Sequence, residues 1–133
     1  MVFVRTACFN LLVLLSIGIL FCLGIRTSDA GECNVTGPYY QLASDTVEWQ
    51  MRIVSGQSCV QGIRFHGVVN ITSIDLISPP ESGQVTVLDH VAFTYMAKPD
   101  FQGQDSFSLQ VSGAIKKVNG TSTIRIVVSI IGR

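Results

Sequence analysis

Residues 83–107 read GQVTVLDHVAFTYMAKPDFQGQDSF. Apolar and polar residues alternate over 85–87 and again over 91–95, with Asp89-His90 between the two runs. Such alternation places one apolar face on a pleated strand, and a short polar break between two runs is typical of a hairpin turn. The stretch therefore predicts a β-hairpin that is followed by a loop over 97–104.

The same alternation recurs on both sides of this hairpin. Further runs lie at 47–53, 63–66, 69–77, 106–112 and 123–130, and connections are expected at 56–58, 78–83 and 113–120. Val, Ile and Thr supply 30 of the 103 residues after Ala30, whereas Leu and Ala supply four each. Because β-branched side chains fit a pleated surface better than a helix, we expect an all-β domain of about seven to nine short strands, a sandwich or a small barrel.

Residues 83–130 resemble the bacterial Ig-like or cadherin-like repeats of large exported and surface proteins. The pattern is a Gly-x-Val-x-Val strand, then Phe-x-Tyr and Pro, then a Phe-x-Gly turn and Asp-Ser-Phe. Here it is carried by Gly83, Val85, Val87, Phe93, Tyr95, Pro99, Phe101, Gly103, Asp105 and Phe107. The resemblance implies an Ig-like β-sandwich that acts as a structural or adhesive module.

The resemblance also implies structural roles for the motif residues. Gly103 is expected to adopt a turn conformation closed to other residues, and Asp105 to accept backbone N–H groups at that turn. Four aromatic rings are expected to pack beneath the loop and close one end of the sandwich: Phe93, Tyr95, Phe101 and Phe107. The family's repeats stand in tandem and generally lack cysteines, so this single copy with a cysteine pair fits a small free-standing exported protein better.

The first 30 residues have the composition of an export signal. They hold 20 of the 63 apolar residues, so they raise the 47% apolar content of this neutral chain. A basic residue precedes an apolar run over 11–25, and small residues end at Ala30, as signal-peptide cleavage requires. We expect a signal peptide over 1–30 and one domain over 31–133, secreted or periplasmic. An uncleaved membrane anchor stays open, because the stretch from Ala7 is long enough to span a bilayer.

Cys33 and Cys59 are the two cysteines that follow the signal segment. An even pair in an exported domain predicts a disulfide, which would pin the N-terminal segment to one sheet. Metal ligation and a catalytic thiol are the rival readings. Both lack their usual spacing, since the sequence has no C-x-x-C and no His within four residues of either cysteine.

Metal-ligating residue types are scattered along the chain. Ca²⁺ requires about six to eight converging oxygens, and no D-x-D-x-D run gathers the aspartates, which are expected to shape turns: Asp75, Asp89, Asp100 and Asp105. Soft ligands for copper are similarly dispersed among core, strand and turn positions: Met51, Met96, His66 and His90. We expect no bound metal and no cofactor.

Catalysis and nucleic-acid binding find little support. The sequence lacks G-x-S-x-G, H-E-x-x-H and a distinctive pair of carboxylates, so no enzymatic activity is expected. Seven basic residues balance eight acidic ones after Ala30, which disfavours a nucleic-acid partner.

Three N-x-T sequons begin at Asn34, Asn70 and Asn119. Thr is common on β-strands, so chance also explains them. In a eukaryotic source they are candidate glycosylation sites, whereas in a bacterial source, which the resemblance suggests, they are incidental.

These features together favour an exported single-domain Ig-like binding or structural module of the cell envelope. A protein or another envelope component would be contacted through the loops 78–83 and 97–104 or through an exposed sheet edge. Two alternatives remain: a small periplasmic carrier of a metal or another ligand, and a single-pass membrane-anchored surface glycoprotein. Membrane contact is expected only through an uncleaved signal segment.

Overall fold

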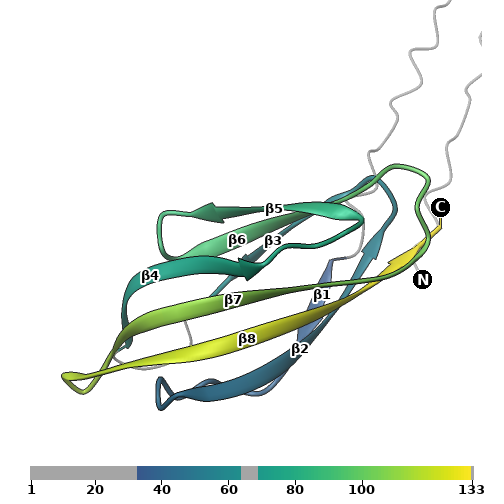
Figure 1. Ribbon diagram of the computed structural model, residues 1–133. Coiled ribbons are helices and arrows are strands. Elements are labelled where there is room, and N and C mark those ends of the chain that lie inside the picture. Colours follow the sequence, from purple (N-terminus) through teal and green to yellow (C-terminus); the bar gives the residue numbers. More distant parts are fainter. Residues whose placement is uncertain (1–32, 64–68, 133) are drawn as a thin grey trace, which may run out of the picture.

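A computed structural model describes residues 33–63 and 69–132, which form eight strands in two packed sheets (Figure 1). The predicted signal peptide lies outside these residues. Within them, no helix is long and apolar enough to cross a membrane. The strands are β1 (Asn34–Thr36), β2 (Asp45–Val54), β3 (Ser58–Gly62), β4 (Val69–Ser78), β5 (Gly83–Leu88), β6 (Ala92–Ala97), β7 (Gly103–Ile115) and β8 (Val118–Ile131).

One sheet has five strands in the order β1-β2-β8-β7-β4, and the other has three in the order β3-β6-β5. Neighbouring strands are antiparallel except β2 and β8, which run parallel over ten paired residues. Two such sheets packed over a shared apolar core form the Ig-like sandwich that the alternating pattern and the resemblance predicted. The fold class is therefore confirmed.

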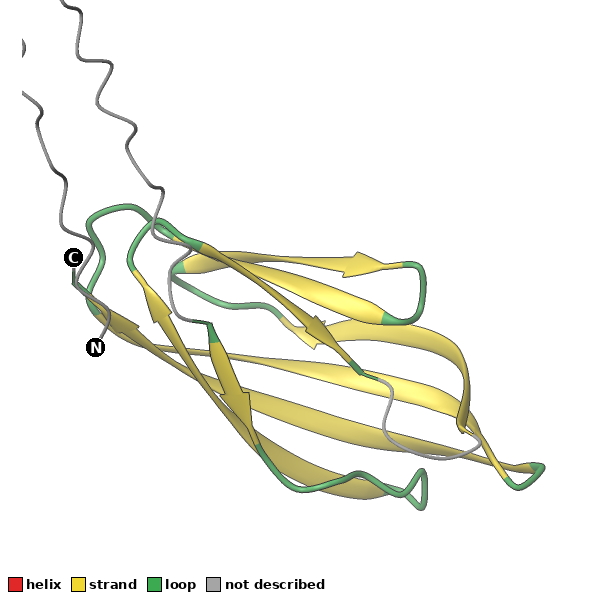
Figure 2. Ribbon diagram, turned by 180° about the vertical axis from the view of Figure 1, so that it is seen from behind, coloured by secondary structure: helices red, strands yellow, loops and turns green. Residues whose placement is uncertain are grey.

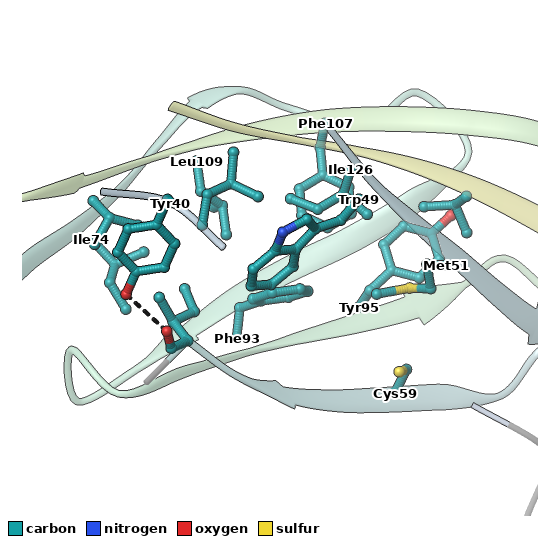
Figure 3. Packing of buried hydrophobic residues seen from close by; sticks show 14 of the residues in the cluster. Tyr40, Trp49, Met51, Cys59, Ile74, Phe93, Tyr95, Phe107, Leu109 and Ile126 are labelled. Atoms are coloured by element: carbon teal, nitrogen blue, oxygen red, sulfur yellow. Dashed lines mark hydrogen bonds between the residues drawn. The ribbon is translucent and has the colours of Figure 1, made fainter. Parts of the chain in front are cut away.

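Alternation along the strands fills the core between the sheets. β2 contributes Trp49 and Met51, which are almost fully buried, while the alternating residues Glu48 and Gln50 face solvent. The Trp49 indole N–H donates to the Pro38 carbonyl at 2.9 Å, so its polar atom is paired as it enters the core. Figure 3 shows Trp49 among the rings of Phe93 and Tyr95 from β6 and of Phe107 from β7.

The hairpin predicted from residues 83–107 is present as β5 and β6, with Asp89 and His90 in its turn at positive φ. The connection expected at 113–120 is wrong, because β7 runs on to Ile115 and β8 begins at Val118. The turn between them has only two residues, Lys116 and Lys117, both at positive φ. Turns of this kind usually use Asn or Gly, so the lysines gave no turn signal.

The strand β3 was not predicted from the sequence. A turn was expected up to Ser58 and a strand from Ile63 to His66, but β3 spans Ser58–Gly62. Cys59 faces the core in β3, whereas the apolar Val60 is 64% exposed. The positions of apolar residues therefore did not reveal which face of β3 is buried. The segment 64–68, which includes His66, lies outside the described residues.

The sandwich has two distinct ends (Figures 1 and 2). We call one the loop end; it comprises the 55–57 turn, the 79–82 and 98–102 loops and Gly132, which follows β8. β1 pairs antiparallel with β2, and Asn34 lies opposite Arg52, which itself pairs with Ser129 near the end of β8. The described chain therefore enters and leaves at the same end.

Candidate interaction site

A disulfide joins Cys33 to Cys59, with 5.5 Å between their Cα atoms. The sequence predicted this pair and expected it to hold the N-terminal segment against one sheet. Cys33 directly precedes β1 at the edge of the five-stranded sheet, whereas Cys59 is buried in β3 of the other sheet. The bridge therefore also links the two sheets along one side of the sandwich.

Asp105 is the one buried carboxylate of the described residues, and it fixes the 79–82 loop. Its Oδ1 accepts the backbone N–H of Glu81 and of Ser106, both at 2.9 Å. Its Oδ2 accepts the N–H of Ser82 at 3.0 Å and the Tyr95 hydroxyl at 2.9 Å. These four hydrogen bonds satisfy a charge that would otherwise be costly to bury.

The donors to Asp105 differ from those expected. We expected backbone groups of the turn at Gly103, but two of the three N–H donors belong to the loop between β4 and β5. The difference arises because β7 places the Asp105 side chain on the inner face, where the neighbouring loop folds over it. Only the packing of the two sheets brings that loop within reach.

Tyr95 completes this arrangement from the three-stranded sheet. Its ring stacks on Phe107 with centroids 5.6 Å apart, and its hydroxyl reaches Asp105. Burial, together with the hydrogen bond to Asp105 and that residue's negative charge, raises the pKa of Tyr95. A Cβ on Gly83 would lie 2.4 Å from the Tyr95 hydroxyl oxygen, so β5 needs glycine where it begins.

The other motif residues divide between core and loop. Phe93 is fully buried and meets Phe107 edge-on, with ring centroids 5.5 Å apart. Phe101 is half-buried against the core, and Pro99 is exposed at the loop end. Gly103 has a φ of 139°, which L side chains rarely adopt, and it lies where the loop enters β7.

Two shallow depressions flank the predicted loops. A depression of about 320 Å³ at the loop end is lined by Ser55, Gly56, Pro99, Asp100, Gln102 and Gly132. A second of about 320 Å³ lies beside the 79–82 loop, where Glu81, Gln104 and Arg125 contribute polar groups. Both loops named from the sequence therefore border a concave surface, and the surface beside the 79–82 loop is lined mainly by polar groups.

The residue types considered for metals are not gathered in the structure. Within residues 33–63 and 69–132, no three His, Cys, Asp or Glu side chains form a group that could hold a metal ion. Met51 is buried in the core, whereas Met96 is 48% exposed on the outer side of the other sheet. His90 lies in the β5–β6 turn.

A second polar network, which the sequence reasoning missed, lies at the opposite end. Asp45 accepts the backbone N–H of Gln41 and of Ala43 and the hydroxyl of Ser122, while Ser122 Oγ accepts the N–H of Leu42. Burial opposes ionisation of Asp45, but these hydrogen bonds outweigh it and hold its pKa below the usual value. No local sequence signal marks this network, because Asp45 bonds residues that precede it and Ser122, which lies 77 residues away along the chain.

The chain belongs to the bacterial Ig domain family, whose model matches residues 41–129. The match begins well before the segment 83–130 that carried the resemblance. It covers β2 to β7 and most of β8, whereas β1 lies outside it. Family membership indicates a structural or binding module; domains of this family are a non-catalytic type of module and are typically extracellular.

Among solved structures, an endo-fucoidan hydrolase of glycoside hydrolase family 107 resembles the chain at 14% identity and a TM-score of 0.42. The alignment covers 81% of this chain and 14% of that chain. The protein thus spans a small part of that enzyme's length, and a likeness this distant carries no argument about activity. None of the curated proteins compared matches the chain.

Proposed function

We propose that this protein is an exported, non-catalytic Ig-like module that binds a protein component of the cell envelope through its loop end. The observation that carries the proposal is the set of four hydrogen bonds accepted by Asp105, which we call the Asp105 clamp. It fixes the backbone of the 79–82 loop at Glu81 and Ser82, although Glu81 itself is exposed to solvent. A loop that is already ordered loses little conformational entropy when it binds a partner.

The neighbouring loop supports the same surface. The N–H of Lys98 donates to the Ser82 carbonyl at 3.2 Å, so the 98–102 and 79–82 loops are joined directly. The Ser55 hydroxyl in turn donates to the Lys98 carbonyl at 3.4 Å. The three segments of the loop end thus form one connected surface on a rigid scaffold, as binding modules commonly use.

The disulfide supports export. Disulfides persist mainly outside the reducing cytoplasm. The Cys33–Cys59 disulfide joins the residue before β1 to strand β3. Edman sequencing and a thiol assay on the protein from its source test this part. A chain that starts near Gly31 and lacks reactive thiols supports export. A chain that starts at Met1 with both thiols free contradicts it.

Site-specific photo-crosslinking in intact cells tests the binding surface. A photoreactive residue at Glu81 or Asp100 is expected to capture one protein of the same mass, because both positions are exposed at the loop end. Thr86, which is exposed on the outer face of β5, is the matched control. Capture from Thr86 but from neither loop position would refute binding through the loop end.

A further inference from the structure

The three-stranded sheet leaves one edge of β5 unpaired. Within the described residues β5 pairs only with β6, and the register of that ladder runs without a shift from Gly83 to Leu88. Edge strands are usually protected by charges, prolines, bulges or short length, because their free N–H and C=O groups can pair with another chain. β5 has six residues, GQVTVL, and shows none of these protections. Its edge is therefore open to an added strand.

The other sheet edges in the described part of the chain are protected or covered. β1 has only three residues, and β4 carries Asp75 and two register shifts. Beside β3, the Cα atom of Cys33 lies 5.5 Å from that of Cys59, which is close to a strand spacing of about 4.8 Å. The chain before β1 thus lies against the edge of β3. This contrast singles out the edge of β5.

The backbone direction shows which β5 residues face the open edge. Successive residues of an antiparallel strand point their N–H and C=O groups to opposite edges. Lys98, which follows β6, donates its N–H to the carbonyl of Ser82, which precedes β5. The even-numbered residues of β5 and β6 therefore bond each other, and the backbone groups of Gly83, Val85 and Val87 point away from β6. A partner strand would pair with these three residues.

Apolar side chains lie beside this edge. Val85 and Val87 point inward and pack against the core, but both stay partly exposed. Leu76 belongs to β4, which contacts β5 from the other sheet. It pairs with the buried Leu109, yet it is 38% exposed. A strand that adds to β5 therefore needs apolar residues at alternate positions to cover these side chains.

We propose that two copies of the protein associate by pairing their β5 strands antiparallel about a two-fold axis at Val85. β5 itself supplies the alternation that the edge requires, with Val85 and Val87 inward and Gln84 and Thr86 outward. Val85 would lie opposite Val85 of the second copy, and Gly83 opposite Val87, so that all three open residues exchange hydrogen bonds. A register centred on Thr86 would use only two of them.

The composition of β5 permits this self-pairing, because the strand has no charged side chain. Like charges approach each other only beyond the strand ends, where Glu81 of one copy would face Asp89 of the other. Added salt should therefore strengthen the association. Six paired residues span about 20 Å, which is small for a specific interface, so the dimer should form only at high protein concentration.

This inference goes beyond the proposed function, because it concerns the side of the sandwich. Antiparallel pairing of β5 directs the two loop ends in opposite directions. A photo-crosslinked product from Thr86 with twice the mass of the chain would report the dimer, whereas capture of an envelope protein from Glu81 or Asp100 reports the loop end. Failure of one proposal therefore leaves the other standing.

Cysteine variants of the full-length chain, expressed in its source, test the register. Gln84 would lie opposite Thr86 of the second copy with Cα atoms about 4.5 Å apart, a distance that a disulfide can bridge. Identical positions would be diagonal neighbours about 7–8 Å apart, which is too far. Oxidation of mixed Gln84→Cys and Thr86→Cys proteins should give a disulfide-linked heterodimer, identified by its intact mass, and either variant alone should stay monomeric. No heterodimer, or equal cross-linking of one variant alone, overturns the proposal.

Sedimentation velocity at increasing protein concentration measures the association itself, with an apparent mass that should rise toward twice that of the chain. Val85→Pro removes an N–H at the open edge without breaking the β6 ladder, so it should keep the protein monomeric. Val60→Pro is the matched control, since its N–H also points away from β6 but lies on β3. A parent protein that stays monomeric, or a dimer that survives Val85→Pro, overturns the proposal. The cysteine variants change only outward side chains, so they decide the question if Val85→Pro does not fold.

Discussion

The Tyr95 hydroxyl donates to the Asp105 carboxylate at 2.9 Å, and this hydrogen bond crosses between the two sheets of the sandwich. Tyr95 belongs to the three-stranded sheet and Asp105 to the five-stranded sheet, so the contact joins the sheets through polar atoms in the core. The same carboxylate holds the 79–82 loop. Packing of the two sheets and the shape of the proposed binding surface therefore depend on one side chain.

Asp105→Asn is expected to lower the free energy of unfolding by about 3 kcal/mol. The amide has only one acceptor oxygen, so its NH₂ group would face N–H or O–H donors that the carboxylate now satisfies. Urea unfolding followed by Trp49 fluorescence measures the loss. Asp75→Asn is the matched control, since Asp75 is exposed and accepts a hydrogen bond from the Ser73 hydroxyl. Its free energy of unfolding is expected to change by no more than about 0.5 kcal/mol. Equal effects of the two variants would contradict the clamp.

A double-mutant cycle between Tyr95→Phe and Asp105→Asn should reveal coupling. Tyr95→Phe removes one of the four donors to Asp105 and is expected to cost about 1–2 kcal/mol. The double variant should lose at least about 1 kcal/mol less than the sum of the two single losses, because both changes break the same bond. Additive losses would show that the contact contributes no energy of its own.

Alkaline pH should destabilise the protein through Tyr40. Burial raises its pKa to about 12 in the folded state, whereas the unfolded side chain titrates near about 10. The folded state thus holds the phenol proton more tightly. The stability that this confers is complete below about pH 10 and is lost as the pH rises toward about 12. Urea unfolding at a series of alkaline pH values measures the decline.

The Tyr40→Phe variant is the test of that assignment. At neutral pH it should be less stable by about 1–3 kcal/mol, because the Ile63 carbonyl loses the hydroxyl that now bonds it at 2.7 Å. Above about pH 10 its stability should fall less steeply than that of the parent protein, and Tyr95 should account for the remaining fall. Parallel pH profiles would refute the role of Tyr40.

Removal of the disulfide by a Cys33→Ala, Cys59→Ala double substitution should cost about 3.5 kcal/mol, the loop-closure value for cysteines separated by 26 residues. Chemical reduction of the parent protein should produce a loss of similar size and should leave the double variant unchanged. Urea midpoints with and without reductant measure both. An identical midpoint for oxidised and reduced parent protein would exclude a stabilising role for the bridge.

Alternation along the chain predicted most of the fold. The hairpin of β5 and β6 and the long strands β2 and β8 were predicted because their inner faces are apolar at every second residue. β4 was also predicted, although two register shifts interrupt its alternation. β3 was not predicted, since Cys59 is its inward residue and Val60 points to solvent. β1 was not predicted, because three residues are too short to display a period.

The candidate site was predicted only in part. Asp105 and Tyr95 were named because the motif resembles a known repeat, and the same residues form the clamp. The Glu81 and Ser82 donors were not predicted, since they lie more than twenty residues away from Asp105 along the chain. No local pattern relates such distant segments.

The class of fold and the pairing of Cys33 with Cys59 follow from the amino-acid sequence, because strand periodicity is local and only two cysteines follow the predicted signal segment. Which groups meet in space depends on how the two sheets pack. The tertiary structure brought the 79–82 loop to Asp105, returned the start of the described chain to the loop end, and placed Asn34, Asn70 and Asn119 on one face. These relationships depend on strand order and register, which are fixed when the two sheets pack and bury their shared core.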